Sequence, residues 1–205
     1  MGLELSGRAT ATVPTRFGEV RMSTFHCDQG REHVSLVFGD VEHHSNLLVR
    51  IHSACATGEL FGSLKCDCGQ QLEQAMTAME REGHGVLIYM NQEGRGIGLA
   101  NKLRAYDLQS RGADTVDANR LLGLPDDTRS YQSAVDELTR LGVHSVRLLT
   151  NNPLKLAAVR DGGIPCHRVS HLVEVGPAAS AYLETKQRRM GHLEKSQPAK
   201  NLLAG

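Results

Sequence analysis

The sequence lacks tryptophan, has only 4% aromatic residues and contains no apolar run long enough to span a membrane. Its 205 residues, 40% of them hydrophobic, suffice for a buried core, and that core must be aliphatic. Few aromatic side chains are available to stack on bases, which disfavours a single-stranded nucleic-acid binder.

A net charge is also missing, because 23 Lys and Arg residues balance 23 Asp and Glu residues. A balanced chain creates no general field that would attract nucleic acid or an anionic membrane surface, so we expect neither partner. An anionic substrate must therefore be held by a local group of cations. Candidates in glycine-rich or polar connections are Arg50, Lys65, Arg95, Arg129 and Lys155.

The N-terminus has no export signal, since a basic segment followed by an apolar one is absent. We therefore expect a cytoplasmic protein, whose reducing surroundings keep thiols free to bind metal. The five cysteines agree with this expectation, because an odd number does not suit a secreted disulfide scaffold.

Three of the five cysteines, Cys55, Cys66 and Cys68, lie within fourteen positions of one another. Three thiolates at this spacing suit one tetrahedral zinc ion and leave its fourth position vacant for chemistry. A disulfide between Cys66 and Cys68 would be strained. The polar neighbours Lys65 and Asp67 argue against inert buried thiols. The cluster therefore predicts a metal site.

Two histidines are candidates for a fourth ligand that would close this metal site. His52 lies three residues before Cys55, at the end of a predicted strand, and His84 is the other nearby imidazole. Catalytic zinc sites usually keep one position open, so we favour an open site over one closed by His52.

Hydrophobic periodicity predicts an α/β fold with a mixed sheet, in which a strand-rich N-terminal half precedes alternating strands and helices. The expected strands are residues 9–13, 19–23, 33–38, 46–51, 86–90, 145–150 and a short one ending at 169. The expected helices are 69–82, 99–111, 131–141, one opened by Pro153, and one from Pro177 to about Met190. We expect a single domain over residues 1–195 and a frayed tail at 196–205.

Two connections and one aromatic residue are further candidates for function. Residues 91–98 contain three glycines that let backbone amides approach an anion, although a tight strand-to-helix turn explains them equally well. Residues 114–131 are polar and turn-rich, which predicts a long functional loop. Tyr106 falls on the inward stripe of the predicted helix with Leu99 and Leu103, where plain core packing is the simplest interpretation.

Four motifs in collinear order resemble GTP cyclohydrolase II, the family that opens riboflavin biosynthesis. They are Arg50-Ile-His-Ser with the three cysteines that follow, Gln92-Glu-Gly-Arg-Gly-Ile-Gly-Leu99, Asp114-Thr-Val-Asp-Ala-Asn119 and Leu149-Thr-Asn-Asn-Pro153. The resemblance covers about residues 9–193. It implies zinc on Cys55, Cys66 and Cys68, magnesium with the triphosphate and a homodimer.

The reaction that the resemblance implies is opening of the imidazole ring of GTP. The products would be formate, pyrophosphate and 2,5-diamino-6-ribosylamino-4(3H)-pyrimidinone 5′-phosphate. A metal that provides a nucleophile at neutral pH suits attack on C8, which lies between two nitrogens.

Individual residues also match functional positions of the family. Asp127 matches its acid/base residue, Arg129 its proposed nucleophile toward the α-phosphate, and Tyr106 a tyrosine at the site. Because a guanidinium stays protonated, we expect Arg129 to be a phosphate contact first and a nucleophile second. The implied GTP contacts are Arg50, Ile51, His52, Ser53, Ala54, Gln71, Glu93, Gly94, Arg95, Thr115, Thr150 and Lys155.

Two positions depart from the family pattern. Ala54 stands where a glutamate usually precedes the first cysteine, and Asn91 stands where a basic residue usually precedes Gln-Glu-Gly-Arg. Either another carboxylate (Glu59, Asp67 or Glu93) substitutes, or only the backbone at position 54 touches the substrate. A specialised paralogue with an altered purine nucleotide or product, and a non-catalytic GTP-binding homologue, are therefore the alternative hypotheses.

Overall fold

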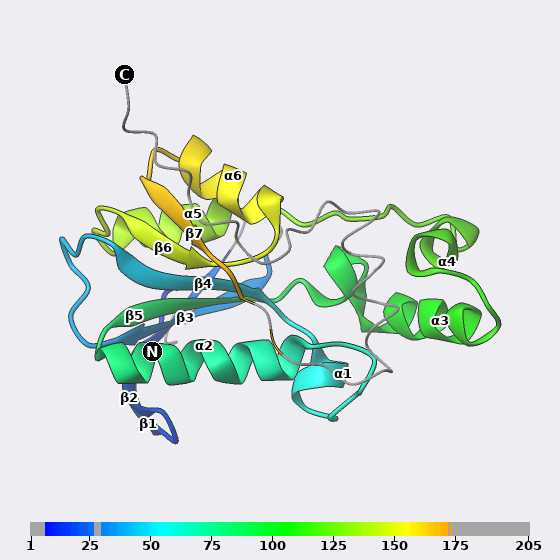
Figure 1. The fold of residues 1–205 in the computed structure, drawn as a ribbon, viewed down its shortest axis with the longest axis horizontal. Helices are drawn as coiled ribbons and strands as arrows, with labels where there is room; N and C mark the ends of the chain where they lie inside the picture. Colours follow the sequence, from blue (N-terminus) through cyan, green and yellow to red (C-terminus); the bar gives the residue numbers. More distant parts are fainter. Residues whose placement is uncertain (1–6, 27–29, 172, 174–205) are drawn as a thin grey trace, which may run out of the picture.

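The computed structural model describes residues 7–26, 30–171 and 173, without the side chains of residues 115 and 116. A seven-stranded mixed sheet forms the centre of this part, in the order β1-β2-β3-β5-β4-β6-β7 (Figure 1). The predicted mixed α/β class is confirmed. The strands are β1 (Thr10–Thr15), β2 (Gly18–His26), β3 (Glu32–Phe38), β4 (Leu47–Ser53), β5 (Gly85–Met90), β6 (Val146–Leu149) and β7 (Cys166–Val169).

The sheet has an antiparallel half and a parallel half. Strands β1, β2 and β3 form an antiparallel meander, and β3 also pairs antiparallel with β5. Strands β5, β4, β6 and β7 run parallel to one another. Parallel neighbours need long crossover connections, and helices fill those connections in the second half of the chain.

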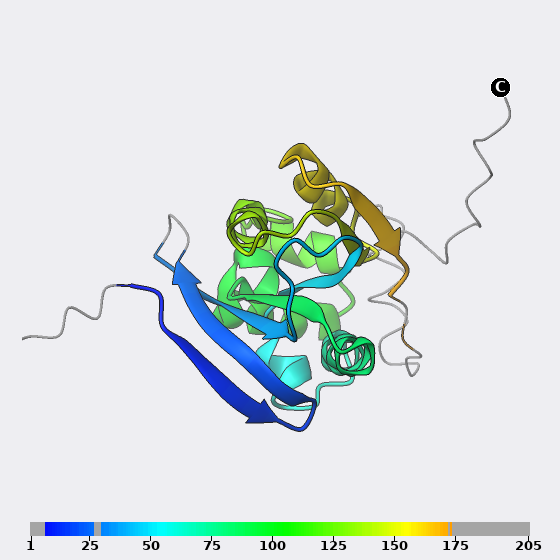
Figure 2. The same ribbon diagram turned by 90° about the vertical axis from the view of Figure 1, so that its left-hand side faces the viewer.

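Helices cover both faces of the sheet (Figures 1 and 2). Helix α2 (Cys68–Glu82) covers one face, where Ala75 and Met79 are fully buried with aliphatic residues of β3 and β5. Helices α5 (Gln132–Arg140) and α6 (Pro153–Asp161) contribute to the larger apolar cluster on the other face. Strand β4 lies between the two layers, and its first six residues are all buried.

Helices α3 (Gly98–Ser110) and α4 (Thr115–Leu121) stand beside the sheet rather than on it (Figure 1). The inward stripe expected on α3 is therefore wrong, because Leu99 and Leu103 are 37% and 50% exposed and Ala105 is the buried residue. The helix packs against α4 and the preceding 3-10 turn, η1 (Glu93–Gly96), and has no sheet to cover.

The expectation of a continuous loop over residues 114–131 is wrong in its first part, where α4 forms. The Asp114 carboxylate accepts a hydrogen bond from the Asp117 backbone amide (2.8 Å), which satisfies a free donor at the helix start. The predicted helix from Pro177 to Met190, the tail and the 1–195 boundary lie outside the described residues. In the described part, no helix is both long and apolar enough to cross a membrane.

Candidate active site at the carboxyl ends of the parallel strands

The predicted site residues follow strands that end at the same edge of the sheet. Register pairs Ser53 of β4 with Met90 of β5, so the segments after these strands start level with each other. Residues 54–67 follow β4, residues 91–97 follow β5 and residues 150–152 follow β6. In open α/β sheets, ligands bind outside the carboxyl ends of the strands, so the topology gathers these segments at the expected place.

The three cysteines converge on the short helix α1 (Ala56–Glu59), which begins directly after Cys55. Their sulfur atoms all lie within 4.8 Å of one another, with 3.5 Å between Cys55 Sγ and Cys66 Sγ. A β-carbon at Gly58 would lie 2.6 Å from Cys66 Sγ and 3.3 Å from Cys55 Sγ. Glycine at position 58 is thus what lets the sulfurs close around one point.

This donor set fits a metal ion. Three thiols are soft ligands that suit zinc-type chemistry, and within the described ranges no His, Asp or Glu joins the three sulfurs as a fourth ligand. His52 is occupied elsewhere, since its Nε2 lies 2.8 Å from Glu59 Oε1. His84 precedes β5 at the opposite end of the sheet, where its ring stacks on His44 with 4.2 Å between centroids.

Lys102 of α3 adds a positive charge beside the sulfurs. Its Nζ donates to Cys55 Sγ (3.0 Å) and to Glu93 Oε1 (2.8 Å). Burial disfavours the charged form, but Glu93 and Cys55 outweigh it and raise the pKa of Lys102. Hydrogen bonds with Cys66, Cys68 and Lys102 lower the pKa of Cys55, whereas the bond with Cys55 raises the pKa of Cys66. The contact with Lys102 therefore favours the thiolate form of Cys55.

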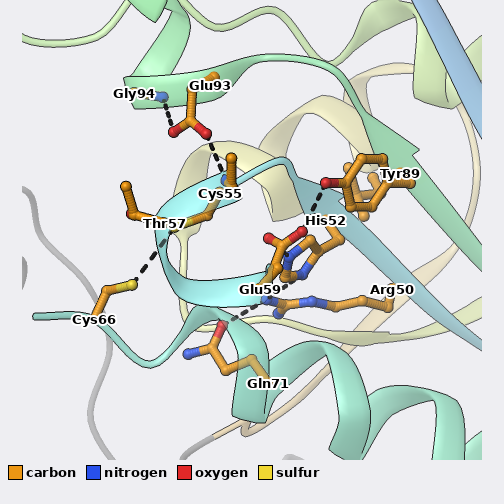
Figure 3. A network of polar contacts seen from close by, with 12 residues as sticks. Arg50, His52, Cys55, Thr57, Glu59, Cys66, Gln71, Tyr89, Glu93 and Gly94 are labelled. Carbon is orange, nitrogen blue, oxygen red and sulfur yellow. Dashed lines mark hydrogen bonds and ion pairs between the residues drawn. The ribbon is translucent and has the colours of Figure 1, made fainter. Parts of the chain in front are cut away.

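Glu93 connects the glycine-rich loop, residues 91–98, to residues 55–68, which carry the three cysteines and form the metal segment (Figure 3). Its Oε2 accepts from the Ala56 amide (2.6 Å) and its Oε1 from the Gly94 amide (2.8 Å). Gly94, Arg95 and Gly96 have φ values of 61°, 60° and 90°, and a β-carbon at Gly96 would lie 2.1 Å from a side-chain atom of Thr128. The glycines thus allow a tight strand-to-helix turn, which is one of the two roles that the sequence suggests for them.

The Asp127 carboxylate and the Arg129 guanidinium form a bidentate ion pair. Arg129 Nε lies 2.9 Å from Oδ1 and Arg129 NH2 lies 2.6 Å from Oδ2 of Asp127. Burial alone would raise the pKa of Asp127, but the hydrogen bonds and charge of Arg129 lower it. The pair is held against the glycine-rich loop, because the Thr128 amide donates to the Arg95 carbonyl (3.1 Å).

Arg50 is a buried cation, 5% exposed, that hydrogen bonds neutral groups (Figure 3). Its NH1 donates to the Leu149 carbonyl (2.8 Å), and its NH2 donates to Gln71 Oε1 (2.6 Å) and lies 3.4 Å from His52 Nδ1. Burial lowers the pKa of Arg50 to about 10. On the other side of β4, Lys155 donates to the Ile51 carbonyl (2.9 Å).

The other predicted residues lie as follows. Tyr106 is brought to the metal segment, with the Lys65 and Lys102 ammonium groups 4.9 Å and 5.8 Å from its ring centroid. Thr150 is buried beside this edge, whereas the side chain of Thr115 lies outside the described part. The Ala54 amide donates to the Met90 carbonyl (2.8 Å), and the Asn91 amide donates to His33 Nδ1 (3.1 Å).

Sequence reasoning missed several residues that build the site, above all Lys102, Tyr89 and Gly58. For Lys102 a signal existed, because it precedes Tyr106 by four residues and therefore shares its helix face. Glu59 was considered only as a substitute base. Its partners His52 and Tyr89 lie on two different strands, which local sequence does not place together.

A family model described as GTP cyclohydrolase II matches residues 7–170. "GTP cyclohydrolase-2" of Proteus mirabilis is 48% identical over 93% of this chain and 97% of its own length, and that of Escherichia coli is 47% identical over 93% and 98%. "Riboflavin biosynthesis protein RibBA" of Salinispora tropica is 50% identical over 90% of this chain.

The chain spans about half the length of the RibBA relative, 47%, and nearly all of the two GTP cyclohydrolase-2 relatives. Among solved structures, RibBX, a two-domain 3,4-dihydroxy-2-butanone 4-phosphate synthase from A. baumannii, aligns over 70% of this chain and 34% of its own. The TM-score is 0.40 at 19% identity, too low to relate the folds. The family match and the identities over nearly full-length relatives show that the chain belongs to the GTP cyclohydrolase II family.

Proposed function

We propose that this chain is a zinc-dependent hydrolase that opens the imidazole ring of GTP. It releases formate and pyrophosphate and forms 2,5-diamino-6-ribosylamino-4(3H)-pyrimidinone 5′-phosphate. The observation that carries the proposal is the cluster of three cysteine sulfurs within 4.8 Å at the carboxyl ends of the parallel strands. Membership of the GTP cyclohydrolase II family supports it, and a cytoplasmic homodimer is part of the same proposal.

Cys55, Cys66 and Cys68 would hold one zinc ion. Zinc in such a site supplies a nucleophile at neutral pH for attack on C8 of guanine and acts as a Lewis acid. Lys102 offsets one of the thiolate charges through its contact with Cys55. Glu93 fixes Lys102 and the start of α1 together, so the metal segment and the glycine-rich loop keep one relative position.

Cations at the same edge would bind the triphosphate with magnesium. Arg50 is buried on β4, and Lys155 is buried next to this strand. Arg95 and Arg129 lie in connections that contact each other through Thr128. Fixed positive groups of this kind stabilise the charge that develops when pyrophosphate leaves. Arg129 already holds Asp127, so it contributes charge rather than a free nucleophile.

Asp127 and Tyr106 would handle protons. Asp127 matches the acid/base residue of the family, and as a carboxylate it can accept a proton. Arg129 keeps its pKa below the ordinary value, so Asp127 is a weaker base than a free aspartate. Tyr106 lies beside Lys65 and Lys102, near the metal segment, where its hydroxyl can steer water or donate a proton during the second hydrolysis, which releases formate.

The proposal is tested by incubating zinc-loaded protein with GTP and magnesium and identifying every product by mass spectrometry, with a separate formate assay. We expect formate and pyrophosphate in equal amounts. A formylated product or turnover of another purine nucleotide would instead establish the specialised paralogue, and GTP binding without product would establish the non-catalytic homologue. The near full-length relatives named GTP cyclohydrolase-2 do not favour these alternatives.

Tyr106→Phe is expected to slow formate release by about 10²-fold, since loss of a positioned proton donor typically costs 10²–10⁴-fold. Zinc content should stay at the wild-type level, because Tyr106 is not among the clustered sulfur ligands. The measurement is single-turnover formate release beside mass spectrometry of the nucleotide, in which a formylated intermediate should accumulate. Formate release at the normal rate would remove Tyr106 from the mechanism.

Ala54→Glu is expected to raise GTP turnover, because it restores a carboxylate next to the first zinc ligand. In this structure Glu59 and Glu93 are both engaged by other groups and do not replace it freely. Steady-state kinetics of the variant and the wild type decide the matter. Unchanged kinetics would show that position 54 contributes only its backbone, whose amide is already bonded to Met90.

A further inference from the structure

A network of buried and half-buried polar side chains lies beside the metal segment and joins four elements (Figure 3). The Tyr89 hydroxyl of β5 donates to Glu59 Oε2 (2.6 Å), and Glu59 Oε1 lies 2.8 Å from His52 Nε2. His52 Nδ1 lies 3.4 Å from Arg50 NH2, which also donates to Gln71. The side chains of His52 and Glu59 are only 2% and 5% exposed, so water does not compete for these contacts.

The Glu59 carboxylate sets which atoms donate and which accept in this hydrogen-bond network. Glu59 only accepts hydrogen bonds, so the nitrogen of His52 that faces it must carry the proton. A neutral imidazole carries a single proton, which leaves Nδ1 as an acceptor toward Arg50. Burial lowers the pKa of His52 to about 4, because it and the charges of Arg50 and Lys155 outweigh the opposing effect of Glu59, so His52 is neutral at ordinary pH.

The opposite tautomer would point an N–H of His52 at the N–H of Arg50, and two donors repel. Arg50 would then lose one of its neutral partners and turn from its present position between Leu149 and Gln71. In the observed arrangement NH1 and NH2 of Arg50 are engaged, and its Nε is buried without a partner. Three of the five N–H groups of Arg50 make these contacts, so the buried guanidinium keeps donor capacity beyond its present partners.

We propose that Glu59 is a positioning residue: it fixes His52 in the Nε2–H tautomer, so that Arg50 is held in its present position between Leu149 and Gln71 for binding of the nucleotide. This inference rests on the proposed function for the identity of the ligand, and on the observed contacts for the role of Glu59. Glu59 follows Gly58, the residue that lies against the cysteine sulfurs. Its contacts with His52 and Tyr89 therefore also attach helix α1 to strands β4 and β5.

The first test measures the tautomer in the wild-type protein and uses a variant only to assign signals. Nitrogen-15 NMR of the histidine side chains distinguishes protonated from unprotonated ring nitrogens, and the His52 signals are assigned by their absence from His52→Gln. We expect His52 to be protonated at Nε2 and unprotonated at Nδ1. Protonation at Nδ1 in the wild-type protein would overturn the proposal.

The second test compares Glu59→Ala with Glu59→Gln and Tyr89→Phe. Alanine removes the 2.8 Å contact with the carboxylate and leaves only the longer 3.4 Å contact with Arg50 to select the tautomer. We therefore expect mixed His52 tautomers and a KM for GTP raised about tenfold with kcat changed less than about threefold. Glutamine keeps an acceptor for His52 and can donate to Tyr89, and Tyr89→Phe leaves the His52 contact intact. Both should retain the Nε2–H tautomer and a KM within about twofold of wild type. A Glu59→Ala protein with the wild-type tautomer or KM would contradict the role.

Two controls separate this inference from other failures. Zinc content measured on each variant shows whether α1 still holds the metal, and a KM change counts only at full occupancy. If the wild-type protein proves not to turn over GTP, the proposed function fails, yet the NMR experiment still decides the role of Glu59. If GTP is turned over and the tautomer does not respond to Glu59→Ala, only the positioning role is lost.

Discussion

Gly58→Ala is expected to abolish metal binding and to lower formate release by at least 100-fold. The added β-carbon would lie 2.6 Å from Cys66 Sγ and 3.3 Å from Cys55 Sγ. Metal–ligand distances tolerate shifts of only about 0.2 Å, so sulfurs displaced by this contact no longer share one ion. The measurement is zinc content by elemental analysis together with the formate assay.

The substitution is a specific probe because it does not disfavour the local backbone. Gly58 does not have a left-handed φ, and alanine favours a helix by about 1 kcal/mol over glycine. We expect unfolding of the metal-free variant to match that of the metal-free wild type. Gly7→Ala is the matched control, since a β-carbon there meets nothing within 4 Å. Normal zinc content in Gly58→Ala would contradict the role of Gly58, because it would show that the three sulfurs still share one ion beside a β-carbon at position 58.

Acidification is expected to remove about 3 kcal/mol of stability through one carboxylate, Glu137 of α5. Its oxygens accept from Arg8 (2.5 and 2.9 Å), from Arg140 (2.9 and 3.0 Å) and from Ser35 (2.7 Å). Burial alone would raise the pKa of Glu137, but these donors outweigh it and lower the pKa to about 2 from an ordinary 4.5.

A carboxylate with a lowered pKa stabilises the fold above its unfolded pKa. This stability is therefore complete above about pH 5 and is lost as the pH falls through 4.5 toward 2. A shift of roughly 2.5 units corresponds to about 3 kcal/mol. Urea unfolding of metal-free protein between pH 7 and pH 2.5 should show the loss.

Glu137→Gln should flatten this pH dependence, because the amide has no charge to lose. Its stability should fall below that of the wild type at pH 7 and approach it at pH 2.5. Glu42→Gln is the control, since the Glu42 side chain is 73% exposed. An unchanged pH dependence in Glu137→Gln would show that other carboxylates govern acid unfolding.

Much of the fold was predictable because its signals are local. The apolar run Val86–Met90 and the helical spacing of Ala75 and Met79 lie within single elements, and both gave the observed strand and helix. The cysteine cluster was predictable for the same reason, since its three ligands lie in one short segment.

What was missed depends on contacts between distant segments. Lys102 reaches Cys55 across 47 positions, and Tyr89 reaches Glu59 across 30. The stripe on α3 was wrong because periodicity indicates which residues share a face and not what that face meets. Leu99 and Leu103 share a face that no sheet covers. Helix α4 is an exception, since its signal is local: the Asp114 side chain accepts from the Asp117 amide three residues later, inside a segment whose polarity predicted a loop.

Arg95 illustrates what the tight turn of the glycine-rich loop means for engineering this protein. It has a φ of 60°, a left-handed conformation that costs a residue with a β-carbon on the order of 1 kcal/mol and costs glycine almost nothing. Selection for heat resistance alone would therefore favour glycine at position 95. Such a variant would be more heat-resistant but would lack the Arg95 guanidinium, one of the cations proposed to bind the triphosphate. Thermostability screens of this protein should therefore be paired with an activity screen.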